Sequence, residues 1–162
     1  MAAIVSLRDV EKDYDMGKVV VRALRGVTME VEKGEFLSIA GPSGSGKTTL
    51  LNLIGCVDVP TRGTVVVAGQ DTGKLTEKAL TELRLRKLGF IFQGFNLVSV
   101  LSVSQNIEFP LMLQGGLTAK DREARVLELL EQVGLREYAK HRPNELSGGQ
   151  RQRVAIARAL VT

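Results

Sequence analysis

The sequence predicts an α/β fold organised around a phosphate-binding loop, and three observations support this prediction. The Gly-rich stretch at residues 41–49 fits the pattern G-x-x-x-x-G-K-[ST]. The apolar, β-prone segment Glu35–Ala40 precedes this stretch, and the helix-forming run Thr48–Ile54 follows it. Short strand patterns fill the region before the loop, whereas the segment Phe95–Pro143 has mostly helical patterns.

Length and composition are those of one globular domain. The chain has 162 residues, of which 44% are hydrophobic and 25% are charged. It contains no apolar run of about 18 residues, so we expect no membrane-spanning helix. Residues 1–10 lack the apolar core of a signal peptide, and we expect none.

The charge pattern bears on a nucleic-acid partner, and the cysteine content bears on disulfides. The formal net charge is +4, with local basic clusters at residues 84–87 and 151–153. No tryptophan accompanies these clusters, so we interpret them as solvated helix faces and predict no nucleic-acid partner. The single cysteine, Cys56, cannot form an intrachain disulfide. We expect it to be a small buried side chain on the helix that follows the loop.

The region before the loop predicts an antiparallel edge layer. Ile4–Val10 alternates as a half-buried strand does. Val19–Val21 and Val27–Val31 predict two further strands, and the turn at 32–34 leads into the strand Glu35–Ala40.

The loop itself has the residue types that bind phosphate. Gly41, Gly44 and Gly46 have no Cβ, so their backbone N–H groups can converge on an anion. Lys47 can reach the β- and γ-phosphates, and the Thr48 hydroxyl can hold Mg²⁺. The predicted phosphate-binding residues are Gly41, Pro42, Ser43, Gly44, Ser45, Gly46, Lys47, Thr48 and Thr49.

Two strands and one helix are predicted between the loop and residue 93. A break at 58–63 precedes the strand Thr64–Val67. Leucines at helical spacing predict a helix over 76–87, and Leu88–Phe92 predicts a short buried strand that ends at Gln93.

Helices are predicted for most of the remaining chain. One helix covers Gln105–Phe109 and is bent or ended by Pro110. A second begins after Thr118 as N-cap and stops at Gly134. Its predicted buried face consists of Ala124, Leu127, Leu130 and Val133.

The last part of the chain predicts a short element and a final helix. Residues 136–140 form a short polar helix or turn that Pro143 ends. The final helix follows a glycine turn at 146–150, and its predicted buried stripe is Val154, Ala157 and Leu160 or Val161.

A family resemblance emerges from this glycine turn. Residues Leu146–Leu160, LSGGQRQRVAIARAL, resemble the signature motif of the ABC ATPases, the nucleotide-binding subunits of ABC transporters. The other family markers stand in the right order: Tyr14, the phosphate loop and Gln93. The resemblance covers the whole chain. The segment Phe92–Leu97 and the residues after it are similar to the lipoprotein-release and macrolide-export type.

The resemblance implies a P-loop NTPase core of the RecA-like kind, with an antiparallel β edge layer, an α-helical subdomain and missing C-terminal core strands. The chain would then be one partial ABC ATPase domain, 1–162. Residues 1–94 would form the nucleotide-binding core and β layer, 95–146 the helical subdomain and 147–162 the signature helix.

The resemblance also implies roles for individual residues. Tyr14 would stack on the adenine ring of ATP. Lys47 and Gln93 would be the catalytic residues, and Thr48 and Gln93 would contact Mg²⁺. A second anion site, which would close over ATP held by another subunit, would consist of Ser147, Gly148, Gly149 and Gln150.

Partners and location follow from the same resemblance. It implies a second ATP-binding subunit in a homodimer and a transmembrane permease subunit, on the cytoplasmic side of the cell membrane. ATP binding and hydrolysis would drive export or extraction of a hydrophobic substrate. Two alternatives stay open: a soluble ABC ATPase of DNA repair or translation, and a hydrolysis-incompetent fragment that only binds nucleotide or a partner.

Family residues that would follow the signature are absent. In the family these are an Asp that holds Mg²⁺, a Glu that polarises the attacking water and a His that senses the γ-phosphate. No Asp or Glu follows Glu145, and the single histidine, His141, precedes the signature. We therefore expect a truncated ATPase that exposes apolar surface and hydrolyses ATP poorly or not at all.

Overall fold

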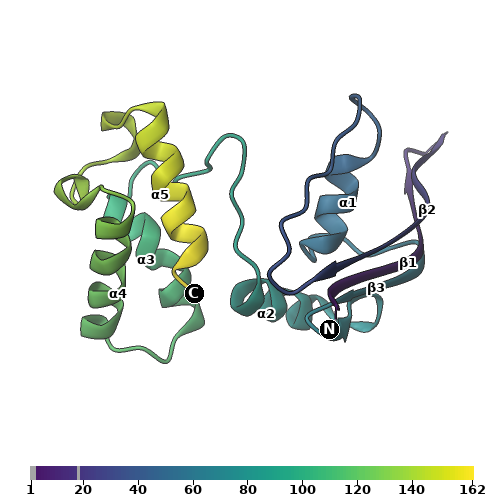
Figure 1. The fold of residues 1–162 in the computed structure, drawn as a ribbon, viewed down its shortest axis with the longest axis horizontal. Helices are drawn as coiled ribbons and strands as arrows, with labels where there is room; N and C mark the ends of the chain where they lie inside the picture. The colour runs from purple at the N-terminus through teal and green to yellow at the C-terminus, as the bar shows by residue number, and fades with distance from the viewer. Residues whose placement is uncertain (1–2, 18) are drawn as a thin grey trace. The chain divides into compact units, whose positions relative to one another are not determined.

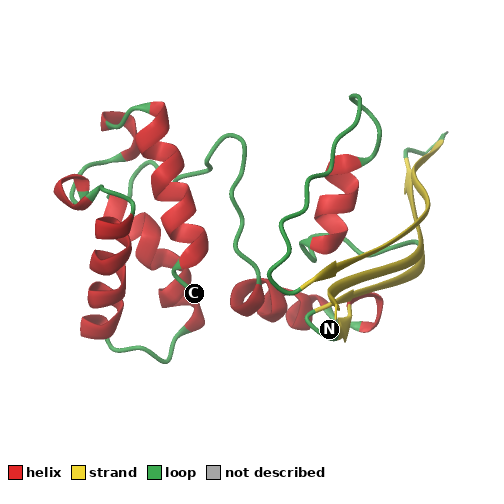
Figure 2. Ribbon diagram, in the orientation of Figure 1, coloured by secondary structure: helices red, strands yellow, loops and turns green. Residues whose placement is uncertain are grey.

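The computed structural model describes residues 3–17 and 19–162. The chain forms two compact units, Met1–Arg84 and Leu85–Thr162. The first contains the sheet, and the second is helical apart from its loops (Figures 1 and 2). Among the described residues, no helix has the length and apolar character needed to cross a membrane.

The first unit is built on a four-stranded antiparallel sheet with the order β2-β1-β3-β4. The strands are β1 (Ala3–Asp15), β2 (Val20–Glu32), β3 (Arg62–Val67) and β4 (Gln70–Asp71). In the register, Leu7 of β1 lies opposite Met29 of β2 and Val65 of β3. Alternate residues of β1 and β3 face the core, because side chains of a strand point to its two faces in turn.

The antiparallel edge layer is confirmed, with one correction. The segments Val19–Val21 and Val27–Val31 were predicted as two strands, but residues 20–32 form the single strand β2. The 13 residues of β1 provide partners along its whole length, and register shifts absorb the irregular pattern between the two segments. Gly26, with φ of +81°, lies where the apolar pattern is interrupted.

Helix α1 (Lys47–Ile54) follows the phosphate loop as predicted and contacts β2 and β3. Its residues Leu50 and Leu53 are buried in the core of this unit. Cys56 is fully buried with a free thiol, also as predicted. It does not lie on the helix, however, because α1 ends at Ile54 and Cys56 has a left-handed φ of +55°.

Two predicted strands do not form. Glu35–Ala40 and Leu88–Phe92 have no regular secondary structure, although both have the apolar composition of strands. A strand exists only through hydrogen bonds to a neighbouring strand. Within the described residues, the backbone of 36–40 and 88–91 makes no such bonds. Several of their large apolar side chains are exposed: Phe36 is 97% exposed and Ile91 is 54% exposed.

Helix α2 (Glu77–Lys87) begins in the first unit and ends in the second. Its buried residues are Leu80 and Leu83, as the leucine spacing predicted. The short 3-10 helix η1 (Thr72–Lys74) precedes it.

Three helices build the core of the second unit. They are α3 (Val103–Gln114), α4 (Ala119–Gln132) and α5 (Gly148–Leu160), joined through the 3-10 helices η2 (Arg136–Tyr138) and η3 (Pro143–Glu145). The core consists of Val103, Ile107, Leu111, Val126, Leu129, Leu130, Leu135, Leu146, Val154, Ala157 and Val161. The predicted stripe of α5 is confirmed, and Val161 is its last member because Leu160 is 58% exposed.

The predicted face of α4 is partly wrong. Val126, Leu129 and Leu130 are its buried residues, whereas Ala124 is exposed. Both sets follow helical spacing, so periodicity alone cannot choose between them. The structure buries the set with the larger side chains, which removes more apolar surface from water.

One proline prediction is wrong, and one of the two alternatives for another is excluded. Pro110 was expected to bend or end its helix, and it does not end it, because it lies inside α3, which continues to Gln114. The buried side chains of Ile107 and Leu111 flank Pro110 and hold both halves of α3 against the core. Pro143 begins η3 instead of ending an element, because its fixed φ and missing N–H suit a first helical position.

The start and the end of α4 are as predicted. The Thr118 hydroxyl accepts a hydrogen bond from the Asp121 N–H at 3.2 Å. Helix α4 ends at Gln132 with Val133 as its C-cap, and the chain turns away at Gly134, which has a φ of +65°.

Candidate nucleotide-binding site

The phosphate loop wraps through three glycines in conformations that other residues rarely adopt. Gly41, Gly44 and Gly46 have φ values of +158°, +79° and +88°. A Cβ on Gly46 would lie 2.6 Å from the carbonyl oxygen of Ala23 and 2.9 Å from a methyl group of Leu24. Gly46 therefore lets the loop sit directly on β2, which fixes where α1 begins.

The end of the loop presents unpaired backbone donors. Gly46 is the N-cap of α1, and no side chain caps this helix. Within the described residues, the N–H groups of residues 46–49 donate to no protein acceptor. The positive end of the helix dipole adds to these four donors. Together they form a site with the geometry and charge that suit a phosphate group.

Lys47 folds back over the loop. Its ammonium donates to the carbonyl oxygens of Gly41 and Pro42 at 2.8 and 2.7 Å. Both acceptors are neutral, so a charged phosphate oxygen is a stronger partner for the same ammonium. Thr48, the next residue, is exposed and offers a hydroxyl oxygen.

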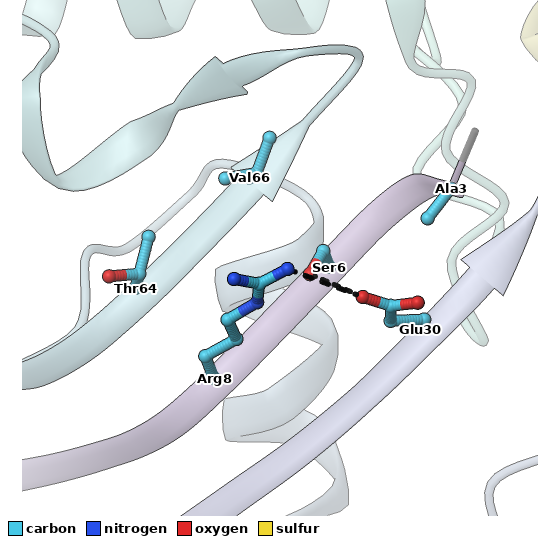
Figure 3. A pocket seen from close by; sticks show the side chains of 6 residues that line it. All are labelled: Ala3, Ser6, Arg8, Glu30, Thr64 and Val66. Atoms are coloured by element: carbon cyan, nitrogen blue, oxygen red, sulfur yellow. Dashed lines mark hydrogen bonds and ion pairs between the residues drawn. The ribbon is translucent and has the colours of Figure 1, made fainter.

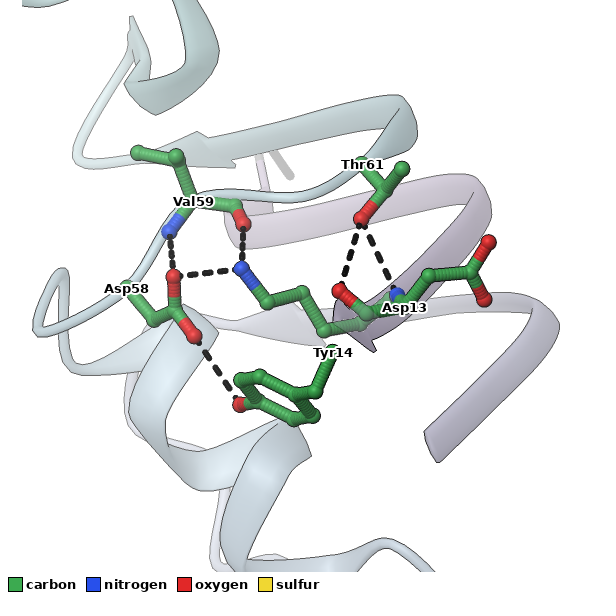
Figure 4. A network of polar contacts seen from close by, with 6 residues as sticks. Asp13, Tyr14, Asp58, Val59 and Thr61 are labelled. Carbon is green, nitrogen blue, oxygen red and sulfur yellow. Dashed lines mark hydrogen bonds and ion pairs between the residues drawn. The ribbon is translucent and has the colours of Figure 1, made fainter. Parts of the chain in front are cut away.

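A polar network joins β1 to the chain that follows α1 (Figure 4). The Tyr14 hydroxyl donates to Oδ2 of Asp58 at 2.9 Å. The Lys12 ammonium donates to Oδ1 of Asp58 at 2.6 Å and to the Val59 carbonyl at 2.9 Å. The backbone N–H of Asp58 donates to the Asn52 carbonyl of α1 at 3.3 Å, which ties this network to the helix that follows the loop. Tyr14 therefore belongs to the same local structure as the phosphate loop.

The network shifts the ionisation of its members. Burial and the Asp58 carboxylate raise the pKa of the Tyr14 phenol above its ordinary value. Burial acts to raise the pKa of Asp58 also, but hydrogen bonds from Lys12, the Val59 N–H and Tyr14 outweigh it, and the net shift is downward. Three donors therefore hold Asp58 as a carboxylate.

Gln93 lies in an exposed loop of the second unit. The loop is fixed from two sides. The Arg158 guanidinium of α5 donates to the Asn96 and Phe95 carbonyls, both at 2.7 Å. Asn106 of α3, 1% exposed, accepts from the Val98 N–H at 2.8 Å and donates to nearby carbonyls.

The signature residues form the start of α5. Ser147 and Gln150 make reciprocal hydrogen bonds, with the Gln150 N–H donating to Oγ of Ser147 at 3.3 Å and the Ser147 N–H donating to Oε1 of Gln150 at 2.8 Å. A Cβ on Gly148 or Gly149 would meet nothing within 4 Å. Neither glycine has a positive φ, so no feature of this unit requires glycine there. The space over both is open to an external group.

The predicted site residues thus fall into two sets. Tyr14 and the phosphate loop are brought together in the first unit, and Gln93 and the signature residues belong to the second. The sequence pattern did not single out Lys12, Asp58, Asn106 or Arg158. Asp58 stood in a predicted break and Arg158 in the apolar second half of the final helix, and neither environment predicts a hydrogen-bond partner.

A shallow hollow on the outer face of the sheet lies apart from the loop (Figure 3). Ser6 and Arg8 line it, and they alternate with the buried residues of β1. Arg8 is already paired with Glu30 at 3.8 Å, and both side chains are well exposed. We interpret this hollow as a solvated sheet face.

Comparison with known proteins identifies the family. The family model described as ABC transporter matches residues 24–162. The chain belongs to the ABC transporter family. An uncharacterized ABC transporter ATP-binding protein of Thermotoga maritima is 52% identical over 160 residues, which are 99% of this chain and 68% of that protein. The macrolide export ATP-binding/permease protein MacB of Hyphomonas neptunium is 47% identical over 158 residues, 98% of this chain and 24% of MacB.

Solved structures of the family share the fold. The dimeric structure of MJ0796, a bacterial ABC transporter cassette, superposes with a TM-score of 0.88 at 47% identity. The match covers 97% of this chain and 69% of that one. A post-hydrolysis dimer of the same cassette, bound to ADP and Pi, gives the same TM-score at 48% identity. The predicted family and fold class are confirmed.

Proposed function

We propose that this chain is the ATP-binding subunit of an ABC transporter and that residues 41–49 bind the phosphates of ATP. The observation that carries the proposal is the set of four unpaired N–H groups at residues 46–49 beside the Lys47 ammonium. The names of its relatives and the nucleotide bound to the MJ0796 cassette support the choice of ATP.

Each loop residue has a part in this function. The N–H groups of residues 46–49 bind phosphate oxygens, and Lys47 exchanges its two carbonyl partners for the β- and γ-phosphates. Thr48 fits Mg²⁺, because Mg²⁺ prefers oxygen ligands and keeps several waters and phosphate oxygens in its shell. The metal supplies charge neutralisation between the phosphates.

Tyr14 provides the surface for the base. Its ring is partly exposed and is tied through its hydroxyl to Asp58. An aromatic face suits an adenine ring, because stacking of a base on it is favourable and does not require a particular pattern of hydrogen bonds. Helix α1 thus begins in the phosphate-binding part of the site and is linked to the base-binding part through Asn52 and Asp58.

The signature residues act on a nucleotide held by a second copy of the chain. Ser147, Gly148, Gly149 and Gln150 begin α5 with open space above both glycines. A head-to-tail homodimer places this helix start against the γ-phosphate in the partner's loop. The dimeric form of the MJ0796 cassette supports this arrangement.

A transmembrane permease is the second partner. The MacB relative is an ATP-binding/permease protein, and the relatives of single-cassette length are named as transporter ATP-binding proteins. We place the chain on the cytoplasmic side of the cell membrane, where the loop after Gln93 meets the permease. ATP turnover would drive export or extraction of a hydrophobic substrate.

Sedimentation with and without Mg-ATP tests the dimer. We expect ATP-dependent dimers for the wild type, and none for Gly149→Glu, which places a side chain and a negative charge over the helix start. Ala124→Glu, at an exposed position of α4, is the matched control and should dimerise normally. Dimers of Gly149→Glu would contradict the role of the signature, and a monomeric wild type would contradict the homodimer.

A further inference from the structure

We propose that Asp58 is the positioning residue of the base-binding side of this site. It holds the Tyr14 hydroxyl and the Lys12 ammonium at once, and so fixes the Tyr14 ring for the adenine of a nucleotide in the phosphate loop. The inference rests on the proposed function and adds a residue that acts on the nucleotide only through Tyr14 and Lys12.

The two oxygens of the Asp58 carboxylate have separate tasks (Figure 4). Oδ2 accepts from Tyr14, whereas Oδ1 accepts from Lys12 at 2.6 Å and from the Val59 N–H at 2.7 Å. The Asp58 side chain is 26% exposed and that of Lys12 is 12% exposed. Because water reaches this pair poorly, its hydrogen bonds are stronger and better ordered than those of a surface pair.

The position of Asp58 links this carboxylate to the phosphate loop. The N–H groups of Val57 and Asp58 donate to the Asn52 carbonyl of α1, at 2.9 and 3.3 Å. The ring on β1 is therefore tied through Asp58 to the last turn of α1, and α1 begins at Lys47 in the phosphate loop. Helix α1 therefore positions both the residue proposed to contact the base and the loop proposed to contact the phosphates.

Lys12 adds a second effect. Its ammonium lies 5.0 Å from the centroid of the Tyr14 ring, a cation–π distance. It covers one face of the ring, so at most one face is left for a base. Asp58 keeps the ammonium in this place. Without the carboxylate, the Val59 carbonyl is the remaining acceptor that holds Lys12 beside the ring.

Base-dependent binding separates positioning from a merely structural role. An Mg²⁺ complex of tripolyphosphate has the phosphates of ATP but no base. If Asp58 acts through Tyr14, its loss weakens ATP binding and spares tripolyphosphate. If Asp58 only supports the fold around α1, its loss weakens both ligands alike.

The experiment measures the dissociation constants of both ligands by calorimetry, with thermal unfolding alongside. Asp58→Asn keeps the shape and removes the charge, and Tyr14→Phe keeps the ring and removes the hydroxyl. We expect each to weaken Mg-ATP binding about tenfold, the size of one hydrogen bond to a charged group, and to change tripolyphosphate binding by less than about twofold. The double variant should be no weaker than the worse single one, because both changes break the same contact.

Two variants make the outcomes distinct. Asp71→Asn, which removes the ion pair with Lys74 and keeps the oxygen that caps η1, is the control and should leave both dissociation constants unchanged. Tyr14→Ala tests adenine stacking itself, and an unchanged ATP affinity would overturn both stacking and this inference. If Tyr14→Ala weakens ATP binding alone but Asp58→Asn and Tyr14→Phe do not, stacking stands and the role of Asp58 is overturned. The role of Asp58 is also overturned if Asp58→Asn weakens the binding of ATP and of tripolyphosphate equally.

Discussion

Replacement of Gly46 by alanine tests whether the phosphate loop is built on close contact with β2. The added Cβ meets the Ala23 carbonyl oxygen at 2.6 Å and a Leu24 methyl group at 2.9 Å. The first neighbour is backbone within a strand and cannot move aside cheaply. The residue also has a φ of +88°, which costs an alanine about 1–2 kcal/mol. Overpacking adds about 1–3 kcal/mol, so we expect Gly46→Ala to lower the free energy of unfolding by about 2–5 kcal/mol.

Gly44→Ala is the matched control for this prediction. Gly44 has a similar φ of +79°, but a Cβ there meets nothing within 4 Å. We expect strain alone, a loss of about 1–2 kcal/mol. Urea unfolding, monitored by circular dichroism, measures the free energy of unfolding of both variants. Calorimetry with Mg-ATP measures their affinity for the nucleotide, which should fall where the substitution displaces the N–H groups of residues 46–49. Equal losses for the two variants would refute the argument that contact with β2 positions the loop.

Two further predictions concern a carboxylate and a core side chain. The Asp58 carboxyl has a pKa below its ordinary value of 3.8, so its contribution to stability is present above that pH and is lost as the pH falls through the lowered pKa. In urea unfolding, the stability difference between wild type and Asp58→Asn should narrow from pH 7 to pH 3, and a constant difference would contradict this. Leu130→Ala should cost about 2–5 kcal/mol, because Leu130 is fully buried. Leu113→Ala, at a 59% exposed position of α3, should cost less than about 0.5 kcal/mol, and similar losses would contradict the assigned core.

Local chemistry made much of this structure predictable. The phosphate loop, the cap at Thr118 and the start of α5 at Ser147 depend on residues a few positions apart, and the sequence contains all of them. The same holds for the buried stripe of α5, where 3.6-residue spacing and apolar side chains agree.

Features that depend on distant partners were missed or wrong. The segment Glu35–Ala40 has the composition of a strand, but composition does not supply a hydrogen-bonding neighbour. The face of α4 was ambiguous because two apolar sets share helical spacing. Asp58 was missed because its partners Lys12 and Tyr14 lie more than 40 positions earlier in the sequence, on another element.

Mg-ATP titration of Lys47→Ala tests the central claim, that residues 41–49 bind the phosphates of ATP. Loss of a hydrogen bond to a charged group costs about 1.5–3 kcal/mol, so the dissociation constant should rise about tenfold or more. Lys33→Ala removes the same charge from an exposed turn after β2 and should bind as the wild type does. Unchanged ATP affinity in Lys47→Ala would contradict the assignment of the phosphate loop and, with it, the proposed function.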